Sequence, residues 1–214
     1  MARWTATLAA AGMLALVASP AQAAPTVVAR WNMDAVPTMV DSAGGDNNGR
    51  TSAITVRGGL YAFDGKTSLA QVPHKVNLNP GTANVTLQAR VNTATPPAPG
   101  ETYDVIRKGT SGTAGGYYKI ELRGKSGGGM TAACIFKDQK RVVGTAVGAI
   151  PSTGWQTITC TKTATSVTLT AGATRTTTRS VGAISNTAGV FIGGKGDGTD
   201  VLSGQMDYAS ITIG

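Results

Sequence analysis

Carboxylates that could act in pairs are scarce in this 214-residue chain, which has two glutamates and nine aspartates. Retaining glycosidases need two carboxyl groups about 5–5.5 Å apart, one as nucleophile and one as acid. Glu101 adjoins a proline-rich loop and Glu121 stands alone on its predicted strand, and neither has a second carboxylate two or four residues away. His74 is the only histidine, and no serine nucleophile motif lies near it. The sequence therefore predicts a non-catalytic protein, with a glycan-active hydrolase as the alternative.

A row of aromatic and charged side chains near the middle of the chain is the candidate ligand site. Tyr117–Arg123 alternates apolar and polar residues, which is typical of a strand with one buried face. Flat rings and planar polar groups on its other face suit a carbohydrate or an extracellular protein, although single tyrosines at a strand surface are also common without any ligand. The candidate ligand-binding residues are Tyr103, Arg107, Tyr117, Lys119, Glu121 and Arg123.

Basic residues exceed acidic ones, and the excess is concentrated in one part of the chain. Between Arg107 and Arg141 there are eight basic and two acidic residues. A basic face attracts anionic polymers outside the cell, such as acidic polysaccharides. The alternative is that lysine and arginine occupy strand positions facing water and keep the protein soluble. Nucleic acid is not an expected partner.

The two cysteines, Cys134 and Cys160, are predicted to form one disulfide, because an exported chain with two cysteines has a single possible pairing. The bond would close a loop of about 27 residues and stabilise the fold by roughly 3–4 kcal/mol in the chain-entropy model. A metal-binding or catalytic role for these thiols lacks further cysteines or a second histidine to support it.

The first 23 residues have the pattern of a secretory signal peptide. Arg3 precedes an apolar segment, Leu8–Val17, and Ala21-Gln22-Ala23 fits the small-x-small cleavage motif. The apolar segment is shorter than the roughly 20 residues that span a bilayer. We therefore expect a signal peptide at 1–23, a secreted protein without a membrane span, and one domain at 24–214.

After this segment the chain reads as short strands separated by glycine-, asparagine- and proline-rich turns. Tyr117–Arg123 and Ala132–Phe136 flank a glycine-rich turn and predict a hairpin. Short extended segments are expected at Leu60–Phe63 and Val76–Leu78, and no segment of useful length has helical periodicity. The predicted fold class is all-β, a two-sheet antiparallel sandwich or barrel.

Several short motifs occur in an order that resembles the laminin-G-like branch of the concanavalin A-like lectin/glucanase superfamily. They are Trp31-Asn32-Met33-Asp34, Asp41-Ser42-Ala43-Gly44, Tyr61-Ala62-Phe63-Asp64-Gly65, the segment around Trp155, Ile192-Gly193-Gly194 and Gly204–Ile211. The resemblance covers about Val27 to Gly214. It implies a jelly-roll sandwich that binds carbohydrate or protein at one sheet face or at the loops on its rim.

The same resemblance implies a calcium site, because laminin-G-like domains often hold this ion with carboxylate and carbonyl oxygens. The candidate ligands are Asp34, Asp41, Asp46 and Asp207. The alternative is that these aspartates accept hydrogen bonds from turn amides. The sequence as a whole predicts a secreted, non-catalytic binding protein, and the alternatives are a hydrolase of the same fold or a structural protein-interaction module.

Overall fold

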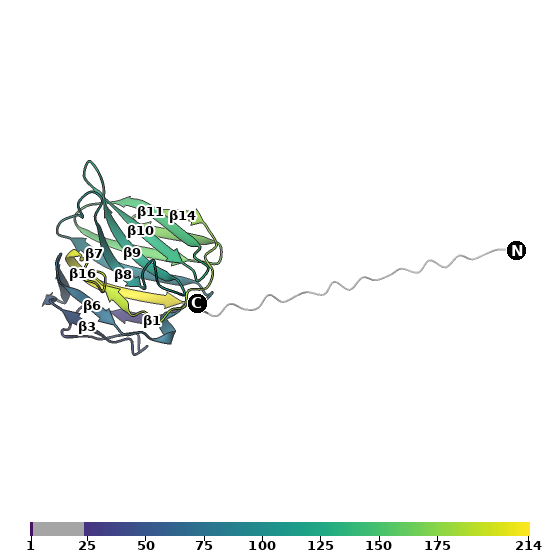
Figure 1. Ribbon diagram of the computed structural model, residues 1–214, viewed down its shortest axis with the longest axis horizontal. Helices are drawn as coiled ribbons and strands as arrows, with labels where there is room; N and C mark the ends of the chain where they lie inside the picture. Colours follow the sequence, from purple (N-terminus) through teal and green to yellow (C-terminus); the bar gives the residue numbers. More distant parts are fainter. Residues whose placement is uncertain (2–23) are drawn as a thin grey trace.

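The computed structural model describes Met1 and residues 24–214, and their strands form two eight-stranded antiparallel sheets that pack face to face (Figure 1). The all-β, two-sheet sandwich predicted from the sequence is confirmed. Except for Met1, the predicted signal peptide lies outside the described residues. No helix among the described residues is long and apolar enough to cross a membrane.

Sheet A has β16 and β7 at its centre. In pairing order its strands are β14 (Ala173–Thr178), β13 (Ser166–Ala171), β12 (Trp155–Lys162), β7 (Val85–Thr93), β16 (Ser203–Ile213), β5 (Leu60–Asp64) and β4 (Thr55–Arg57), and β1 (Thr26–Trp31) also pairs with β16. The first and last strands of the sandwich are therefore neighbours, with Trp31 opposite Ala209.

Sheet B has β8 and β15 at its centre, and half of its strands, β8 to β11, come from the middle of the chain. In pairing order they are β11 (Val143–Ile150), β10 (Met130–Lys137), β9 (Tyr117–Gly124), β8 (Thr102–Lys108), β15 (Val190–Ile192), β6 (Leu69–Val72), β3 (Gly49–Ser52) and β2 (Thr38–Met39). The predicted hairpin is β9 and β10. The strand expected at Val76–Leu78 is instead the short 3₁₀-helix η1 (Val76–Leu78), because Asn79 donates its amide to the Val76 carbonyl.

The core lies between the sheets and follows the alternation of the strands. Every second residue of β7 is buried, and Tyr118, Ile120 and Leu122 of β9 meet them from sheet B. Trp31 is fully buried, and its indole N–H donates to the Asn47 carbonyl at 2.8 Å. The residues between these inward positions face away from the core, so the outer face of sheet B carries the polar members of β8 and β9.

The disulfide between Cys134 and Cys160 is confirmed, with the two Cα atoms 5.3 Å apart. It joins β10 of sheet B to β12 of sheet A across the core. The bond therefore ties β10, the neighbour of the candidate ligand strand β9, to the opposite sheet.

Candidate ligand-binding site

Five of the six predicted ligand residues gather on the outer face of sheet B. Tyr117, Lys119, Glu121 and Arg123 alternate along β9, and Arg107 of β8 lies opposite Lys119. The sixth, Tyr103, faces the other way: it lies opposite the core residue Leu122 and packs against the core.

The cause of this exception is a β-bulge in β8 between Asp104 and Ile106. A bulge adds one residue to a strand, so the side chains that precede it point to the opposite faces of the sheet from those that strict alternation predicts. It turns Tyr103 inward and puts Asp104 on the outer face, opposite Glu121. Strict alternation counted back from Arg107 predicts the reverse, so the placement of Tyr103 at the ligand face was wrong.

The outer-face charges form a network of ion pairs, with one connected chain of five residues and one separate pair, Lys195 with Asp200, close to it. Asp104 contacts both Arg107 and Lys119, and Lys119 also contacts Glu121. Arg123 extends the network through Glu121, and Lys195 pairs with Asp200 at 2.6 Å. The network contains four cations (Arg107, Lys119, Arg123 and Lys195) and three carboxylates (Asp104, Glu121 and Asp200), so it carries one surplus positive charge.

Most of this network is buried, although it lies on an outer sheet face. The side chains of Asp104 and Arg107 are 0% and 4% exposed, whereas that of Arg123 is 38% exposed. Burial raises the pKa of Asp104, against the opposing effect of the Lys119 and Arg107 charges. Burial likewise lowers the pKa of Lys119, against the attraction of Asp104. The network is thus a preorganised set of charged groups, and breaking any of its buried ion pairs would cost free energy.

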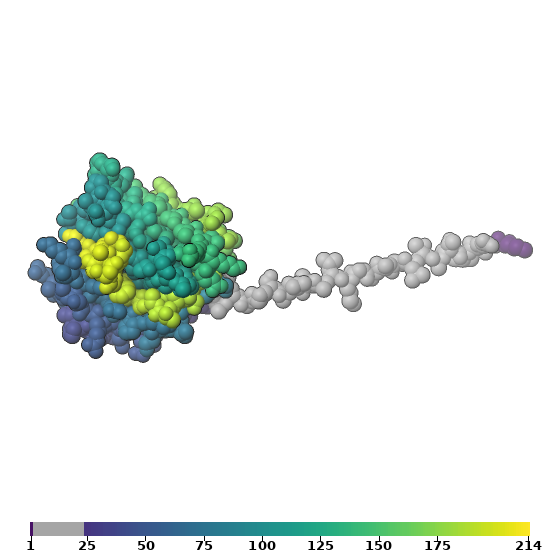
Figure 2. All heavy atoms as spheres, in the orientation of Figure 1, coloured from purple at the N-terminus to yellow at the C-terminus, as the bar shows by residue number. Residues whose placement is uncertain are grey.

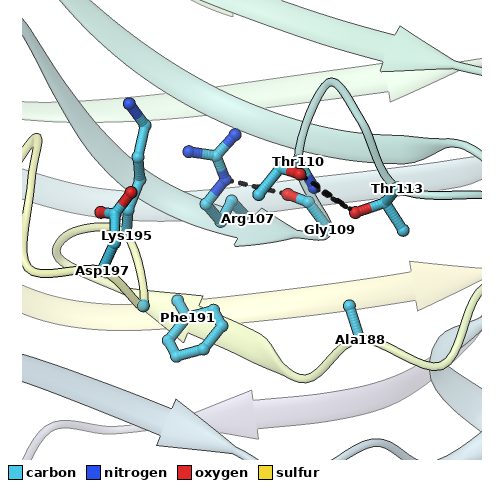
Figure 3. Close-up of a pocket in the computed structure, with 9 residues that line it drawn as sticks. Arg107, Gly109, Thr110, Thr113, Ala188, Phe191, Lys195 and Asp197 are labelled. Atoms are coloured by element: carbon cyan, nitrogen blue, oxygen red, sulfur yellow. Dashed lines mark hydrogen bonds between the residues drawn. The ribbon is translucent and has the colours of Figure 1, made fainter.

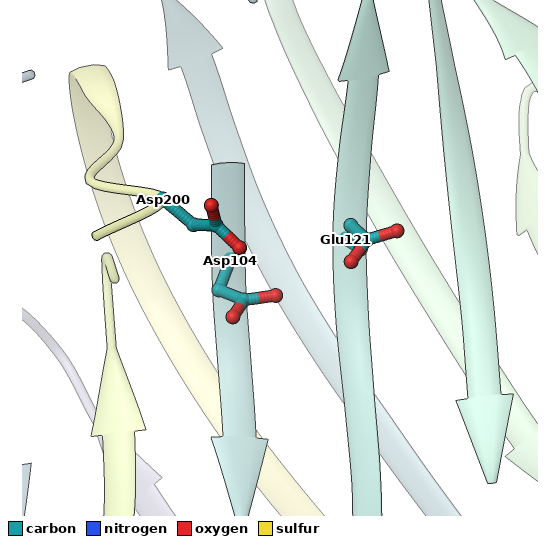
Figure 4. A group of neighbouring side chains, drawn as sticks. All are labelled: Asp104, Glu121 and Asp200. Carbon is teal, nitrogen blue, oxygen red and sulfur yellow. The ribbon is translucent and has the colours of Figure 1, made fainter. Parts of the chain in front are cut away.

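Three carboxylates of the network approach one another closely (Figure 4). One oxygen from each of Asp104, Glu121 and Asp200 lies within 4.8 Å of the others. These carboxylates already face four protein cations, and so their charge is neutralised without a metal ion. The arrangement fits an ion-pair network better than a cation site.

A cavity of about 280 Å³ opens beside Arg107, at the edge of this network (Figure 3). Its lining combines one aromatic ring with groups that donate or accept hydrogen bonds, which is the composition expected of a small-molecule site. The lining residues are Arg107, Gly109, Thr110, Thr113, Ala188, Phe191, Lys195, Gly196 and Asp197. Arg107 lies between the Lys195–Asp197 segment and Thr110, with Phe191 below it in the view of Figure 3.

Two ordered loops make the walls of the cavity. In the loop that follows β15, Lys195 donates its amide to the Thr199 carbonyl at 2.9 Å, and Asp104 of β8 donates its amide to the Asp200 carbonyl. A Cβ on Gly196 would lie 2.5 Å from the Phe191 ring, so glycine leaves this ring open to the cavity. In Figure 2, yellow atoms of the C-terminal part of the chain accordingly lie against teal atoms of its middle.

The opposite wall is the β8–β9 loop. Thr113 donates its amide to the Thr110 carbonyl, and Asn186 donates its side-chain amide to the Gly116 carbonyl at 2.8 Å. Gly116 has a φ of +89°, and a Cβ there would lie 2.1 Å from the Lys137 carbonyl oxygen. On the far side of this loop is a second, more polar cavity of about 210 Å³, lined by residues that include Asp138 and Arg141.

A buried lysine holds the segment that carries Ala188, one of the residues that line the first cavity. Lys108, the last residue of β8, is fully buried and donates to the carbonyls of Asn186 and Ala188 at 3.0 and 2.6 Å. It also donates to the Asn186 side chain and lies 3.3 Å from Nδ1 of His74. No carboxylate is among these partners, and burial lowers the pKa of Lys108 to about 8. The ammonium group thereby anchors the segment that carries Ala188.

The part of the outer face beyond β9 is apolar. Tyr117, Ala133 and Ile135 form a small buried cluster, and the Lys137 ammonium lies 5.9 Å from the centre of the Tyr117 ring. Val143 and Val147 of β11 are exposed beside it. Across the outer face of sheet B, the cavity beside β15 and β8 is thus followed by the charged residues of β8 and β9 and then by apolar residues on β10 and β11.

The basic stretch between Arg107 and Arg141 does not form an open basic face. Arg107, Lys108 and Lys119 are buried, and Arg123 is paired with Glu121. Of the remaining four, Lys125 lies in the β9–β10 turn, whereas Lys137, Lys140 and Arg141 lie at the end of β10 and in the turn that follows it. The basic residues that could attract an anionic polymer are therefore one small group at this turn and a single lysine, and not a basic face along the whole stretch.

Three of the four aspartates predicted to bind calcium are engaged in other contacts. Asp41 accepts hydrogen bonds from the amides of Arg30, Ala43 and Asn47, so it holds its turn. Asp46 pairs with Lys75, and Asp207 with Arg90. Asp34 is exposed. None of the four belongs to the one close group of three acidic side chains found among the described residues.

Comparison with known proteins shows similar folds among solved structures but does not show a family. No family model and no curated protein sequence matches the chain. Solved structures with a similar sandwich include botulinum neurotoxin type C, which depends on interaction with two ganglioside molecules for cell uptake (TM-score 0.63, 10% identity, 87% of this chain and 47% of the toxin chain). This chain thus spans about half the length of the toxin chain.

Two further similar structures come from glycan-active enzymes. Domain 4 of an extracellular GH43 arabinanase from Geobacillus stearothermophilus, in complex with arabinotriose, matches with a TM-score of 0.61 and 13% identity over 89% of this chain and 93% of that chain. A Trypanosoma rangeli sialidase in complex with 2,3-difluorosialic acid matches with a TM-score of 0.55 and 15% identity, over 86% of this chain and 30% of the sialidase chain. At these identities the likeness shows the fold alone, a two-sheet β-sandwich.

Several site residues were missed in the sequence. Phe191, Lys195, Asp197 and Asp200 lie about 70 residues after the β9 row, and only the pairing of β15 with β8 brings them beside Arg107. The glycine-rich segment Gly193–Gly198 was a visible turn signal, but a turn signal does not show which sheet face it borders. Asp104 points to the outer face because of the bulge in β8, and no residue type in this strand predicts a bulge.

Proposed function

We propose that this chain is a secreted, laminin-G-like, non-catalytic protein that binds carbohydrate on the outer face of sheet B. One observation carries the proposal: the cavity beside Arg107 combines the ring of Phe191 with the charged and hydroxyl groups of Arg107, Thr113 and Asp197. A pyranose ring has apolar C–H faces and a polar edge, so it matches an aromatic wall next to hydrogen-bonding groups. The similar structures, which include ganglioside-dependent and arabinotriose-bound proteins, support this ligand class.

Secretion is supported by the chemistry of the two cysteines. The Cys134–Cys160 bond crosses the core, and structural disulfides of this kind persist in oxidising compartments outside the cytosol. The signal-peptide pattern at 1–23 points the same way. N-terminal sequencing of the protein recovered from culture fluid tests this: a start at Ala24 supports export and cleavage.

The ligand face is tested by a glycan screen followed by one variant on each sheet. Phe191→Ala removes the aromatic wall of the cavity, and we expect the affinity for a glycan that binds the wild type to fall about tenfold, or about 1.4 kcal/mol. Tyr208→Ala is the matched control, because Tyr208 is half-buried on the outer face of sheet A and donates to Gln88 there. Equal losses in both variants would refute the proposed location. A wild type that binds no glycan but captures an extracellular protein would instead favour an interaction module.

A glycan-active hydrolase is the second candidate, and one observation favours it. Asp104 and Glu121 face each other on neighbouring strands, with carboxylate oxygens within 4.8 Å, close to the separation used by retaining glycosidases. Against it, both side chains are at most 6% exposed, both contact Lys119, and neither lines the cavity. Release of reducing ends from polysaccharides by the wild type, lost in Glu121→Gln and Asp104→Asn, would establish this function and overturn the non-catalytic one.

Calcium binding by Asp34, Asp41, Asp46 and Asp207 stays a prediction. A ligand that binds only the folded state raises the melting temperature. Thermal melts with calcium and with EDTA therefore test the prediction: a lower melting temperature in EDTA, absent in Asp46→Asn, supports it, and identical curves remove it.

A further inference from the structure

We propose that the cavity beside Arg107 takes the carboxylate-bearing terminal sugar of an acidic glycan. This inference rests on the proposed function and names the ligand class of the same site. Three independent features carry it: the surplus positive charge of the network, the free side of the Arg107 guanidinium, and the size and lining of the cavity.

At the cavity end of the network, Arg107 shares its carboxylate with a second cation. Asp104 contacts both Arg107 and Lys119, and Lys119 also contacts Glu121, whereas Asp104 is the one carboxylate that Arg107 contacts among the described residues. At the far end the Arg123 side chain is 38% exposed, and water solvates its charge. Arg107 is only 4% exposed, and a buried positive charge without a full partner is costly. A carboxylate in the cavity would supply the missing negative charge.

The Arg107 guanidinium is held in place with one side unused. Its Nε donates to the Gly109 carbonyl at 3.0 Å, and Nη1 donates to Asp104. Nη2 has no hydrogen-bond partner among the described residues, and it is not fully buried. Because Arg107 lines the cavity, we place the free N–H groups of Nη2 on the cavity side. A fixed guanidinium edge of this kind binds a carboxylate with two parallel hydrogen bonds.

The rest of the cavity fits a sugar ring and no more. A volume of about 280 Å³ lies at the lower limit of small-molecule sites, roughly 300–1,000 Å³, so one ring fits and an extended chain does not. Phe191 offers an apolar face, and Thr110 and Thr113 offer hydroxyl groups. The site is thus suited to the end of a glycan rather than to its interior.

Two charged residues at the mouth make the ligand charge testable. Lys195 lies 2.6 Å from Asp200 and adds a second positive group. Asp197 is exposed, and hydrogen bonds from Thr199 lower its pKa, so it is negatively charged at neutral pH. For an acidic ligand Lys195 attracts and Asp197 repels. For a neutral sugar the same aspartate only accepts hydrogen bonds from hydroxyl groups. Removing its charge therefore has opposite effects on the two ligand classes.

The experiment compares matched acidic and neutral sugars by calorimetry on the purified protein. The pairs are 3′-sialyllactose against lactose, and a glucuronic-acid-terminated disaccharide against its glucose-terminated counterpart, with acetate as a control for a carboxylate alone. We expect at least one acidic sugar to bind about tenfold tighter than its neutral partner, with an affinity that falls as salt is added. The sugar pair that shows the difference identifies the type of acid.

The variants locate the site. Arg107→Lys keeps a positive charge beside Asp104 but removes the guanidinium edge that donates two parallel hydrogen bonds. We expect this variant to bind the acidic sugar about tenfold more weakly. Lys195→Gln should weaken it about threefold and Asp197→Asn should strengthen it by a similar factor, whereas Lys66→Gln, at an exposed lysine in the β5–β6 turn, should change nothing. Ala188→Phe fills the cavity without altering charge and should abolish binding.

The outcomes separate this inference from the function on which it rests. Equal binding of acidic and neutral sugars, with Asp197→Asn weakening both, would overturn the inference and leave carbohydrate binding intact. Acidic preference that survives Arg107→Lys and Ala188→Phe would place the carboxylate elsewhere and also overturn it. A wild type that binds none of the sugars tested, nor any glycan in the screen, would overturn the proposed function itself.

Discussion

The buried ammonium group of Lys108 should make the stability of the protein depend on pH in the alkaline range. Burial lowers the pKa of Lys108 to about 8, whereas the unfolded chain has the ordinary value of 10.5. Between these two values the unfolded state binds more protons than the folded state, so the free energy of unfolding rises with pH. Integrating the two titrations from pH 8 to pH 10 gives an increase of about 2 kcal/mol.

Urea unfolding followed by tryptophan fluorescence at pH 7, 8, 9 and 10 measures this increase. The range stops at pH 10 because burial raises the pKa of Tyr61 to about 12, and such tyrosines reduce stability at higher pH. Lys108→Met should be less stable at pH 7, since it leaves the Asn186 and Ala188 carbonyls without their donor, and its stability should rise much less with pH. Lys66→Met, at an exposed site, should keep the wild-type slope. A flat wild-type profile, or a full slope in Lys108→Met, would refute this account of Lys108.

Further predictions concern the parts that hold the site. Replacing both Cys134 and Cys160 by alanine should reduce the free energy of unfolding by about 3–4 kcal/mol, measured by urea titration; a change below about 1 kcal/mol would show that the unfolded chain is not restricted by the bond. Asp41→Ala leaves three amides of its turn without an acceptor and should cost about 3 kcal/mol, whereas Asp34→Ala, at an exposed aspartate, should cost less than about 0.5 kcal/mol. Gly196→Ala brings a Cβ against the Phe191 ring and should weaken glycan binding with little loss of melting temperature; unchanged affinity would show that the ring does not contact the ligand.

Periodicity alone was sufficient for the strands that carry the predicted ligand row. The side chains of a regular strand alternate strictly, so the pattern of Tyr117–Arg123 already showed which residues face the core, and the structure agrees. The same reasoning failed in β8, because the bulge after Asp104 changes the facing of Tyr103 without any change in residue types. The disulfide could be predicted because two cysteines allow a single pairing.

What the sequence by itself determined about this protein is local: strand periodicity, turn composition, the number of cysteines, and hence an all-β sandwich with polar residues on one face of β9. The tertiary structure decided which distant segments meet. Only the pairing of β15 with β8 brings Phe191 and Lys195 to Arg107, and only cross-strand register puts Asp104 opposite Glu121. The physical reason is that strand neighbours and loop positions depend on the packing of the whole chain, so a cavity built by three segments leaves no signal in any one of them.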